Sequence, residues 1–321
     1  MRGRRRRPQA GAPPAERWRR SAGTAVPRAA TTVTLLKLGA VVGLKGQVQT
    51  VNGRDTLVRV GVTCALCHST VDNSFAPGIG KRLDGWANTT LDPGAIIALS
   101  PAVSTALKAT LNSWGPGKYD PRINIDGQNT PLVLPPAYGL RGIDLETFTG
   151  EGPVSYWNAY VAITQMHGQG TFIDSRLGIR IIQTPDLVMP RLGALRAYQL
   201  SLASPPPPAG SYDAAAAQRG RVVFTGAGGC ASCHSGSAFT DVNEGKLHAP
   251  GETGMDPRYA ARTSRKAYRT TPLRALWQHA PYFHDGSAAT LTDVVAHYDR
   301  VRNLRLSAQQ KQDLTEYLKS L

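Results

Sequence analysis

Two copies of one short motif contain every cysteine of this 321-residue chain: residues 64–68 read CALCH and residues 230–234 read CASCH. The pattern C-x-x-C-H is typical of covalent haem attachment, in which two thiols form thioethers with the haem vinyl groups and the histidine binds the iron. We therefore predict two covalently bound haem c groups. The predicted haem-binding residues are Cys64, Cys67, His68, Cys230, Cys233 and His234.

Cysteine pairs at this spacing have two other common uses, a zinc site and a redox-active dithiol. Four thiolates could bind one zinc ion, but such a site would not require a histidine directly after each pair. A thioredoxin-type dithiol is expected inside a βαβ pattern, which surrounds neither motif. Haem attachment accounts best for all four cysteines, and it leaves none for a disulfide.

The formal net charge of +15 is concentrated at the start of the chain, where residues 1–28 carry nine arginines and one glutamate. Such a tail could bind nucleic acid or anionic lipid. No nucleic-acid-binding module follows it, however, and its composition is typical of a disordered segment. We therefore predict a disordered basic leader over residues 1–40 and no nucleic-acid partner.

Haem c is normally attached outside the cytoplasm, which predicts a periplasmic protein with an export signal. The basic start is followed by Pro, Ala and Glu rather than by an apolar stretch, so no convincing signal peptide is present. Residues 34–44 are apolar but interrupted by Lys37, and they are too short to span a bilayer. We expect a periplasmic location and no transmembrane segment.

Each haem motif is followed, after a long loop-rich stretch, by a closing amphipathic helix. These helices are predicted at residues 192–202 (LGALRAYQLSL) and 314–321 (LTEYLKSL), where apolar residues recur at helical spacing. Ser307 and Gln310 could form a capping box before the second of them. The chain therefore contains one unit twice, where a unit is a haem motif, a loop-rich stretch and a closing helix.

Other local signals mark the edges of these units. Residues 213–224 predict a helix that opens the second unit with Asp213 as its N-cap. The polyproline run at residues 205–208 is a stiff spacer that cannot continue a helix. In the first unit, residues 47–62 alternate in polarity and could form a hairpin that turns at Asn52-Gly53.

These signals together predict a mainly α, loop-rich fold of two class I cytochrome c-like haem domains in tandem. The predicted segments are a basic leader at 1–40, an N-terminal haem domain at 41–203, a Pro-rich linker at 204–210 and a C-terminal haem domain at 211–321.

The C-terminal unit also carries a longer signature. Residues 271–274 read TPLR, residues 280–287 read APYFHDGS, and Thr290-Leu291 follow. This set resembles the bacterial di-haem cytochrome c peroxidase family, which includes the methylamine-dehydrogenase-maturing di-haem enzyme and, more distantly, di-haem rubber oxygenases. The resemblance covers residues 211–321 well. Over residues 60–203 it depends on the haem motif and the closing helix alone.

The resemblance implies a division of labour. One haem, usually the C-terminal one, is a sealed six-coordinate electron relay, whereas the other has an open face where peroxide or dioxygen binds.

The relay haem of the peroxidases takes a Met soon after Thr-Leu, but residues 292–298 contain none. Tyr298 resembles a match to that Met, and His297 is a common type of haem ligand. Neighbours on a helix point about 100° apart, so only one of the two can face the iron. Either ligand gives a lower potential than Met.

The first haem lacks a nearby candidate ligand, because residues 69–88 contain no histidine where the peroxidases often have one. This indicates an open face, or a ligand from elsewhere such as Met166 or His167. The aromatic residue expected between the haems could be Trp86, Trp114 or Trp157. As candidates for catalytic roles we name Glu146, Glu151 and Trp114.

We predict a peroxidase-type oxidoreductase that reduces hydrogen peroxide at the N-terminal haem, with the C-terminal haem as the electron relay. A non-enzymatic di-haem electron carrier and a di-haem oxygenase of the rubber-oxygenase type are the alternatives. The resemblance also implies a small redox protein as electron donor, a cytochrome c or a cupredoxin, and a homodimer.

Overall fold

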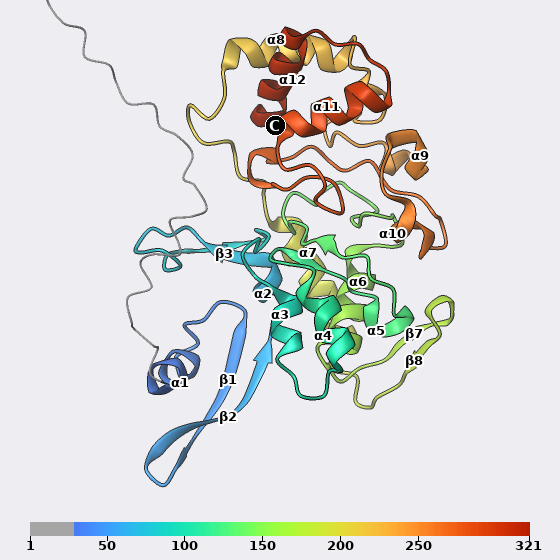
Figure 1. Cartoon of the computed structure of the whole chain (residues 1–321). Coiled ribbons are helices and arrows are strands. Elements are labelled where there is room, and N and C mark those ends of the chain that lie inside the picture. The colour runs from blue at the N-terminus through green and yellow to red at the C-terminus, as the bar shows by residue number, and fades with distance from the viewer. Residues whose placement is uncertain (1–28) are drawn as a thin grey trace, which may run out of the picture. The chain divides into compact units, whose positions relative to one another are not determined.

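The computed structural model describes residues 29–321, and these fall into two compact units, Met1–Gly61 and Val62–Leu321 (Figure 1). Within the first unit, helix α1 (Ala29–Lys37) precedes a hairpin of β1 (Leu44–Val51) and β2 (Arg54–Val62). Asn52 and Gly53 turn this hairpin with φ values of 50° and 73°, as the sequence predicts. Helix α1 occupies part of the leader 1–40 that we predicted to be disordered, and residues 1–28 of that leader lie outside the described residues.

The second unit contains both haem motifs, and its α-helices are mostly short. They are α2 (Ala65–His68), α3 (Pro93–Ala98), α4 (Thr105–Asn112), α5 (Ile123–Asp126), α6 (Val154–Tyr160), α7 (Leu192–Ser201), α8 (Ala214–Thr225), α9 (Pro250–Thr253), α10 (Pro257–Ala261), α11 (Leu291–Val301) and α12 (Ala308–Ser320).

Short strands interrupt the helices and form separate two-stranded antiparallel sheets rather than one long sheet. The pairs are β3 (Ser69–Val71) with β4 (Arg82–Asp84), β5 (Lys118–Tyr119) with β6 (Leu132–Val133), and β7 (Phe172–Asp174) with β8 (Ile179–Ile181). The predicted loop-rich character therefore holds, but the fold mixes helices with small sheets. The predicted division at residues 204–210 stays a prediction, since Val62–Leu321 forms one compact unit.

The C-terminal part of this unit is built on the crossing of α8 and α12, beside α11 (Figure 1). Asp213 caps α8 by accepting hydrogen bonds from the backbone of Ala215 and Ala216, and Ser307 forms the predicted capping box with Gln310. The helices bury Phe224, Leu314 and neighbouring apolar side chains in one core. Among residues 29–321, no helix combines the length and apolarity needed to cross a membrane.

Gly220 is required where α8 meets α12, because a Cβ there would lie 2.0 Å from the carbonyl oxygen of Asp313. We expect Gly220→Ala to lower the free energy of unfolding by about 1–3 kcal/mol, the usual cost of overpacking a core. Urea unfolding of the haem-loaded protein would measure it. Gly193→Ala is the matched control, since Gly193 is helical, exposed and has no atom near its added Cβ. Equal effects of the two changes would contradict the close-approach explanation.

Candidate haem sites

The first motif places His68 at the end of helix α2. Its Nδ1 lies 3.0 Å from the carbonyl oxygen of Pro135, and Nε2 has no hydrogen-bond partner among residues 29–321. The strand pair that follows fixes the backbone at this point, since Ser69 pairs with Asp84 and the amide of Gly85 donates to the carbonyl of His68.

The second motif forms a short 3-10 turn, Cys230–Ser232, which begins after Gly229 in the left-handed region at φ 60°. His234 repeats the geometry of His68, because its Nδ1 lies 3.0 Å from the carbonyl oxygen of Phe239. Phe224, on the crossing helix α8, packs beside the His234 ring at 6.3 Å between ring centroids. Both histidines are therefore held through Nδ1 and offer Nε2.

This arrangement fits an iron ligand on each histidine. Burial lowers the pKa of His68 and of His234, so both rings are neutral at pH 7 and keep a lone pair. A hydrogen bond from Nδ1 to a carbonyl fixes the tautomer that leaves Nε2 free for a metal. Burial also raises the pKa of Cys67 and of Cys230 to about 11, which is typical of thiols that are neither nucleophiles nor zinc ligands.

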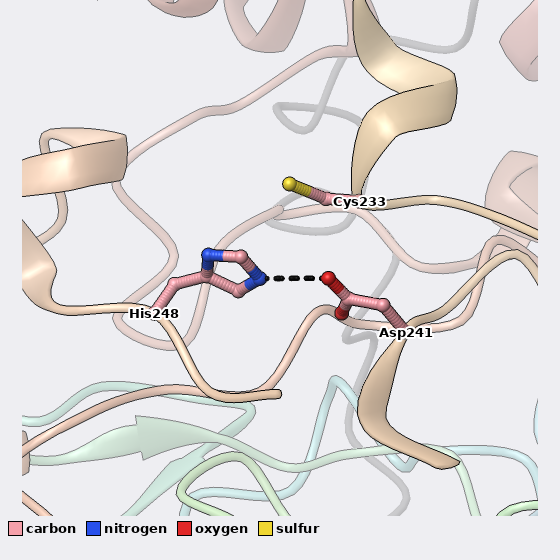
Figure 2. Close-up of side chains that lie close together, drawn as sticks. All are labelled: Cys233, Asp241 and His248. Carbon is pink, nitrogen blue, oxygen red and sulfur yellow. Dashed lines mark hydrogen bonds and ion pairs between the residues drawn. The ribbon is translucent and has the colours of Figure 1, made fainter. Parts of the chain in front are cut away.

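Asp241 and His248 lie next to Cys233 at the second motif (Figure 2). His248 Nε2 is 3.0 Å from Asp241 Oδ2, and its Nδ1 is 3.0 Å from Glu252. Burial opposes a charge on His248, but its hydrogen bonds to Glu252 and Asp241 outweigh burial and raise its pKa. The three residues could hold a metal ion by distance alone. Because haem attachment is predicted to use the Cys233 sulfur, we do not assign a separate metal site to these residues.

The two candidate ligands of the second haem, His297 and Tyr298, point in different directions from α11. His297 Nε2 lies 2.8 Å from the carbonyl oxygen of Thr253, next to helix α9. Burial raises the pKa of Tyr298 to about 12, with smaller contributions from the neighbouring thiols of Cys230 and Cys233. Tyr298 therefore lies near the second motif, whereas the His297 ring is held by the end of α9.

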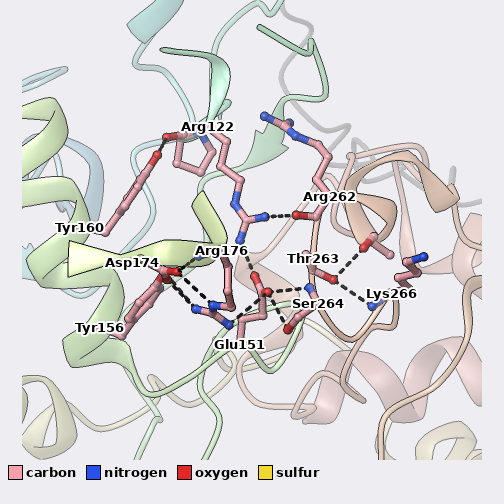
Figure 3. Close-up of polar contacts among 12 residues, drawn as sticks. Arg122, Glu151, Tyr156, Tyr160, Asp174, Arg176, Arg262, Thr263, Ser264 and Lys266 are labelled. Carbon is pink, nitrogen blue, oxygen red and sulfur yellow. Dashed lines mark hydrogen bonds and ion pairs between the residues drawn. The ribbon is translucent and has the colours of Figure 1, made fainter. Parts of the chain in front are cut away.

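The two candidate catalytic carboxylates are both engaged in structural contacts. Glu146 pairs with Arg196 at 3.1 Å and accepts a hydrogen bond from the amide of Val154. Glu151 pairs with the buried Arg122 and also accepts from the amide and hydroxyl of Ser264 (Figure 3). Because no carboxylate oxygen of either residue is left without a partner, we do not propose them as proton donors.

Trp114 lies one aromatic ring away from the first motif. It is almost fully buried, it donates through Nε1 to Asn129, and it packs edge-to-face on Tyr119 at 5.7 Å. The thiol of Cys67 contributes to the raised pKa of Tyr119, whose main cause is burial, so Tyr119 lies near the first motif. Trp114 stays a prediction, with a packing role in the structure.

Trp86 meets a tryptophan that the sequence analysis did not single out. Its ring lies 5.6 Å from that of Trp277 and 6.4 Å from that of Tyr138, both edge-to-face. Trp86 follows Gly85, which is bonded to the backbone of His68. Trp277 lies in the C-terminal region, three residues after the TPLR string. Its position next to that string is the sequence feature that could have identified it as a candidate.

Comparison with known proteins agrees with the motifs. A family described as RoxA-like, cytochrome c-like matches residues 267–305. Methylamine utilization protein MauG from Methylorubrum extorquens is 31% identical over 33% of this chain and 34% of its own length. Cytochrome-c peroxidase IdrP1 from Pseudomonas sp. (strain SCT) is 28% identical over 32% of this chain and 39% of its own.

The chain is a relative of the bacterial di-haem cytochrome c peroxidases. It spans between 34% and 39% of the length of the curated relatives just named. Among solved structures, a Kuenenia stuttgartiensis hydrazine synthase aligns with a TM-score of 0.40 and 22% identity, covering 60% of this chain and 73% of that chain. A MauG-like protein associated with microbial copper homeostasis aligns with a TM-score of 0.33 and 24% identity, covering 40% and 52%.

These similarities imply covalently bound haem c, and the two C-x-x-C-H motifs stay its predicted attachment sites. The free Nε2 atoms of His68 and His234 and the buried thiols beside them fit that group. A tyrosine lies near each motif, but the hydroxyl of Tyr119, near the first, donates to Gln165, whereas Tyr298 of α11 lies near the second.

Proposed function

We propose that this protein is a peroxidase-type oxidoreductase in which the second haem relays electrons and the first haem meets hydrogen peroxide. The observation that carries this proposal is the asymmetry between the two sites. The thiols of Cys230 and Cys233 contribute to the raised pKa of Tyr298, and from this proximity we infer that Tyr298 completes the coordination at the second motif. Near the first motif, by contrast, the hydroxyl of Tyr119 donates a hydrogen bond to Gln165 at 2.7 Å. The haem iron, when bound, supplies the one-electron steps, and each peroxide takes two electrons and two protons to give two waters.

At the first motif, the remaining histidines are used elsewhere. In the described part of the chain they contact Asp241 (His248), Tyr138 (His279), Tyr268 (His284) and Thr253 (His297), while His167 is exposed and lines a hollow of about 350 Å³. None of these contacts favours a sixth ligand at the first haem. This supports an iron with an open face there.

Trp86 and Trp277, whose rings lie 5.6 Å apart, come from the regions that carry the first and the second motif. Trp86 is tied through Gly85 to the backbone of His68, and Trp277 lies in the C-terminal region that carries His234. We propose that these two rings carry electrons from the relay haem to the peroxide-reducing haem. The donor to the relay would be a small redox protein, a cytochrome c or a cupredoxin, in the periplasm.

The match to RoxA-like, cytochrome c-like sequences over residues 267–305 supports a second candidate, a haem-dependent oxygenase that uses dioxygen. The matched region is the part that surrounds the relay haem, so it does not describe the open site. We therefore place peroxide reduction first, because cytochrome-c peroxidases are among the relatives.

The test is electron paramagnetic resonance combined with rapid mixing. We expect one high-spin and one low-spin ferric haem, and oxidation of both reduced haems when one equivalent of peroxide is added. Trp86→Phe should slow oxidation of the low-spin haem about tenfold, which corresponds to about 1.4 kcal/mol in the activation free energy, and leave both spin states unchanged. Two low-spin haems that are inert to peroxide would show an electron carrier instead. Consumption of dioxygen without consumption of peroxide would show an oxygenase.

A further inference from the structure

A tyrosine with a base beside it lies next to the Trp86–Trp277 contact. The ring of Tyr138 lies 6.4 Å from that of Trp86, which in turn lies 5.6 Å from that of Trp277. Tyr138 is only 4% exposed. Its hydroxyl lies 3.0 Å from Nε2 of His279, and the centroids of these two rings lie 5.9 Å apart. An oxidisable phenol, an imidazole and two indoles therefore share one cluster.

The backbone of Tyr138 belongs to the segment that holds the first haem motif. The carbonyl of Pro135 holds Nδ1 of His68, and the amide of Ala137 donates to the carbonyl of Gly85 at 2.8 Å. A Cβ added to Gly85 would lie 3.0 Å from the Cβ of Tyr138, so the two segments are in close contact. Tyr138 is therefore fixed to the same backbone as the first motif.

Oxidation of a tyrosine requires a base, because the phenol becomes a strong acid once it loses an electron and then releases its proton. Two acceptors lie within hydrogen-bond distance of the Tyr138 oxygen, namely Oε1 of Gln278 at 2.7 Å and Nε2 of His279 at 3.0 Å. A carboxamide oxygen accepts a hydrogen bond but is too weak a base to take the proton. A neutral imidazole can take it.

Burial sets the protonation states of this pair at rest. It lowers the pKa of His279 to about 4, with no contribution from a charged neighbour, so the imidazole is neutral at pH 7. Burial also raises the pKa of Tyr138, so the phenol keeps its proton. The proton therefore stays on the oxygen until an electron is removed, and it returns when the electron is restored.

From this geometry we propose that Tyr138 and His279 form a redox-active pair that supplies an electron when the relay haem is already oxidised. The pair's role rests on the peroxide reduction proposed for the first haem. Hydrogen peroxide is the oxidant, and it takes one electron from the first haem and one from Tyr138. The O–H bond of Tyr138 breaks, an N–H bond forms at Nε2 of His279, and a neutral tyrosyl radical remains. An electron from the relay, passed through Trp277 and Trp86, restores the phenol.

The experiment adds one equivalent of peroxide to the fully ferric protein, followed by freeze-quench electron paramagnetic resonance. We expect a tyrosyl radical, formed more slowly in D2O than in H2O. Tyr138→Phe should remove the radical and leave the spin states of both ferric haems unchanged. His279→Gln keeps a hydrogen-bonding group without a base. It should slow radical formation about a hundredfold, the lower end of what a positioned base contributes, and abolish the solvent isotope effect.

Tyr282→Phe is the matched control. Burial raises the pKa of Tyr282 to about 12, but its hydroxyl donates to the backbone carbonyl of Leu276 at 2.8 Å, and a backbone carbonyl cannot take the proton. This variant should keep the radical and its isotope effect. A radical that persists in Tyr138→Phe, or that forms equally fast in His279→Gln, would overturn the proposal.

A photochemical oxidant, a ruthenium tris-bipyridyl complex with persulfate, separates the pair from peroxide reduction. If the protein is inert to peroxide but illumination gives a radical that depends on Tyr138 and His279, the pair is supported and the proposed function alone fails. Absence of a Tyr138 radical with both oxidants would overturn the pair, and peroxide reduction would still stand wherever the haems react with peroxide.

Discussion

Replacing Tyr298 with Phe should convert the second haem from a low-spin, six-coordinate centre to a high-spin, five-coordinate one. The Tyr298 phenol lies near enough to Cys230 and Cys233 for their thiols to contribute to its raised pKa, and Phe keeps its ring while removing the oxygen. An oxygen ligand stabilises ferric iron, so the potential of this haem should rise by on the order of 0.1 V or more, within the roughly 0.8 V range over which axial ligands act. Electron paramagnetic resonance and redox titration would measure both effects.

His297→Gln is the control for this experiment. Its Nε2 is bonded to the carbonyl of Thr253, and Gln can keep a donor near that oxygen. We expect the second haem to stay low-spin in this variant. A high-spin second haem in His297→Gln together with a low-spin one in Tyr298→Phe would assign the ligand to His297 and require α11 to turn when haem is attached.

The sequence could not decide between these neighbours because the answer depends on the rotation of α11 about its own axis. Both residues fit a helix, and the capping box of Thr290 with Asp293 fixes where that helix begins. Its rotation is set by packing of Leu291 and Val295 into the core shared with α8 and α12. That information is tertiary, whereas the caps at Asp213 and Ser307 are local and could be predicted correctly.

Two other features could not be predicted from the sequence, because they too depend on tertiary contacts. Glu146 and Glu151 are suitable acids by type, but their partners Arg196 and Arg122 lie 50 and 29 residues away, so spacing gives no sign of the ion pairs. The Trp86–Trp277 contact joins residues from opposite ends of the second unit. By contrast, the haem motifs and the Asn52-Gly53 hairpin are short-range patterns with a fixed geometry.

Arg122 should be one of the most sensitive positions for stability in the chain. It is 1% exposed, pairs with Glu151, and donates to the carbonyl of Arg262 (Figure 3). Arg262 in turn pairs with Asp120 at 2.8 Å, so this buried network joins the segment that follows β5 to the segment that follows α10. Breaking such a pair from one side leaves a buried charge without its partner, which typically costs 3–5 kcal/mol.

We therefore expect Arg122→Met to lower the free energy of unfolding by about 3–5 kcal/mol, and the double variant with Glu151→Gln to recover a large part of that loss. Recovery follows because the buried Glu151 carboxylate would keep only the half-exposed Arg176, 3.7 Å away, as a charged partner, and Gln removes that poorly compensated charge. Chemical unfolding of the haem-loaded protein in a double-mutant cycle would measure the coupling.

Lys246→Met, which breaks an ion pair between side chains that are 55% and 54% exposed, should cost less than about 1 kcal/mol. If Arg122→Met were no more costly than this control, the network would not be what ties the two segments together.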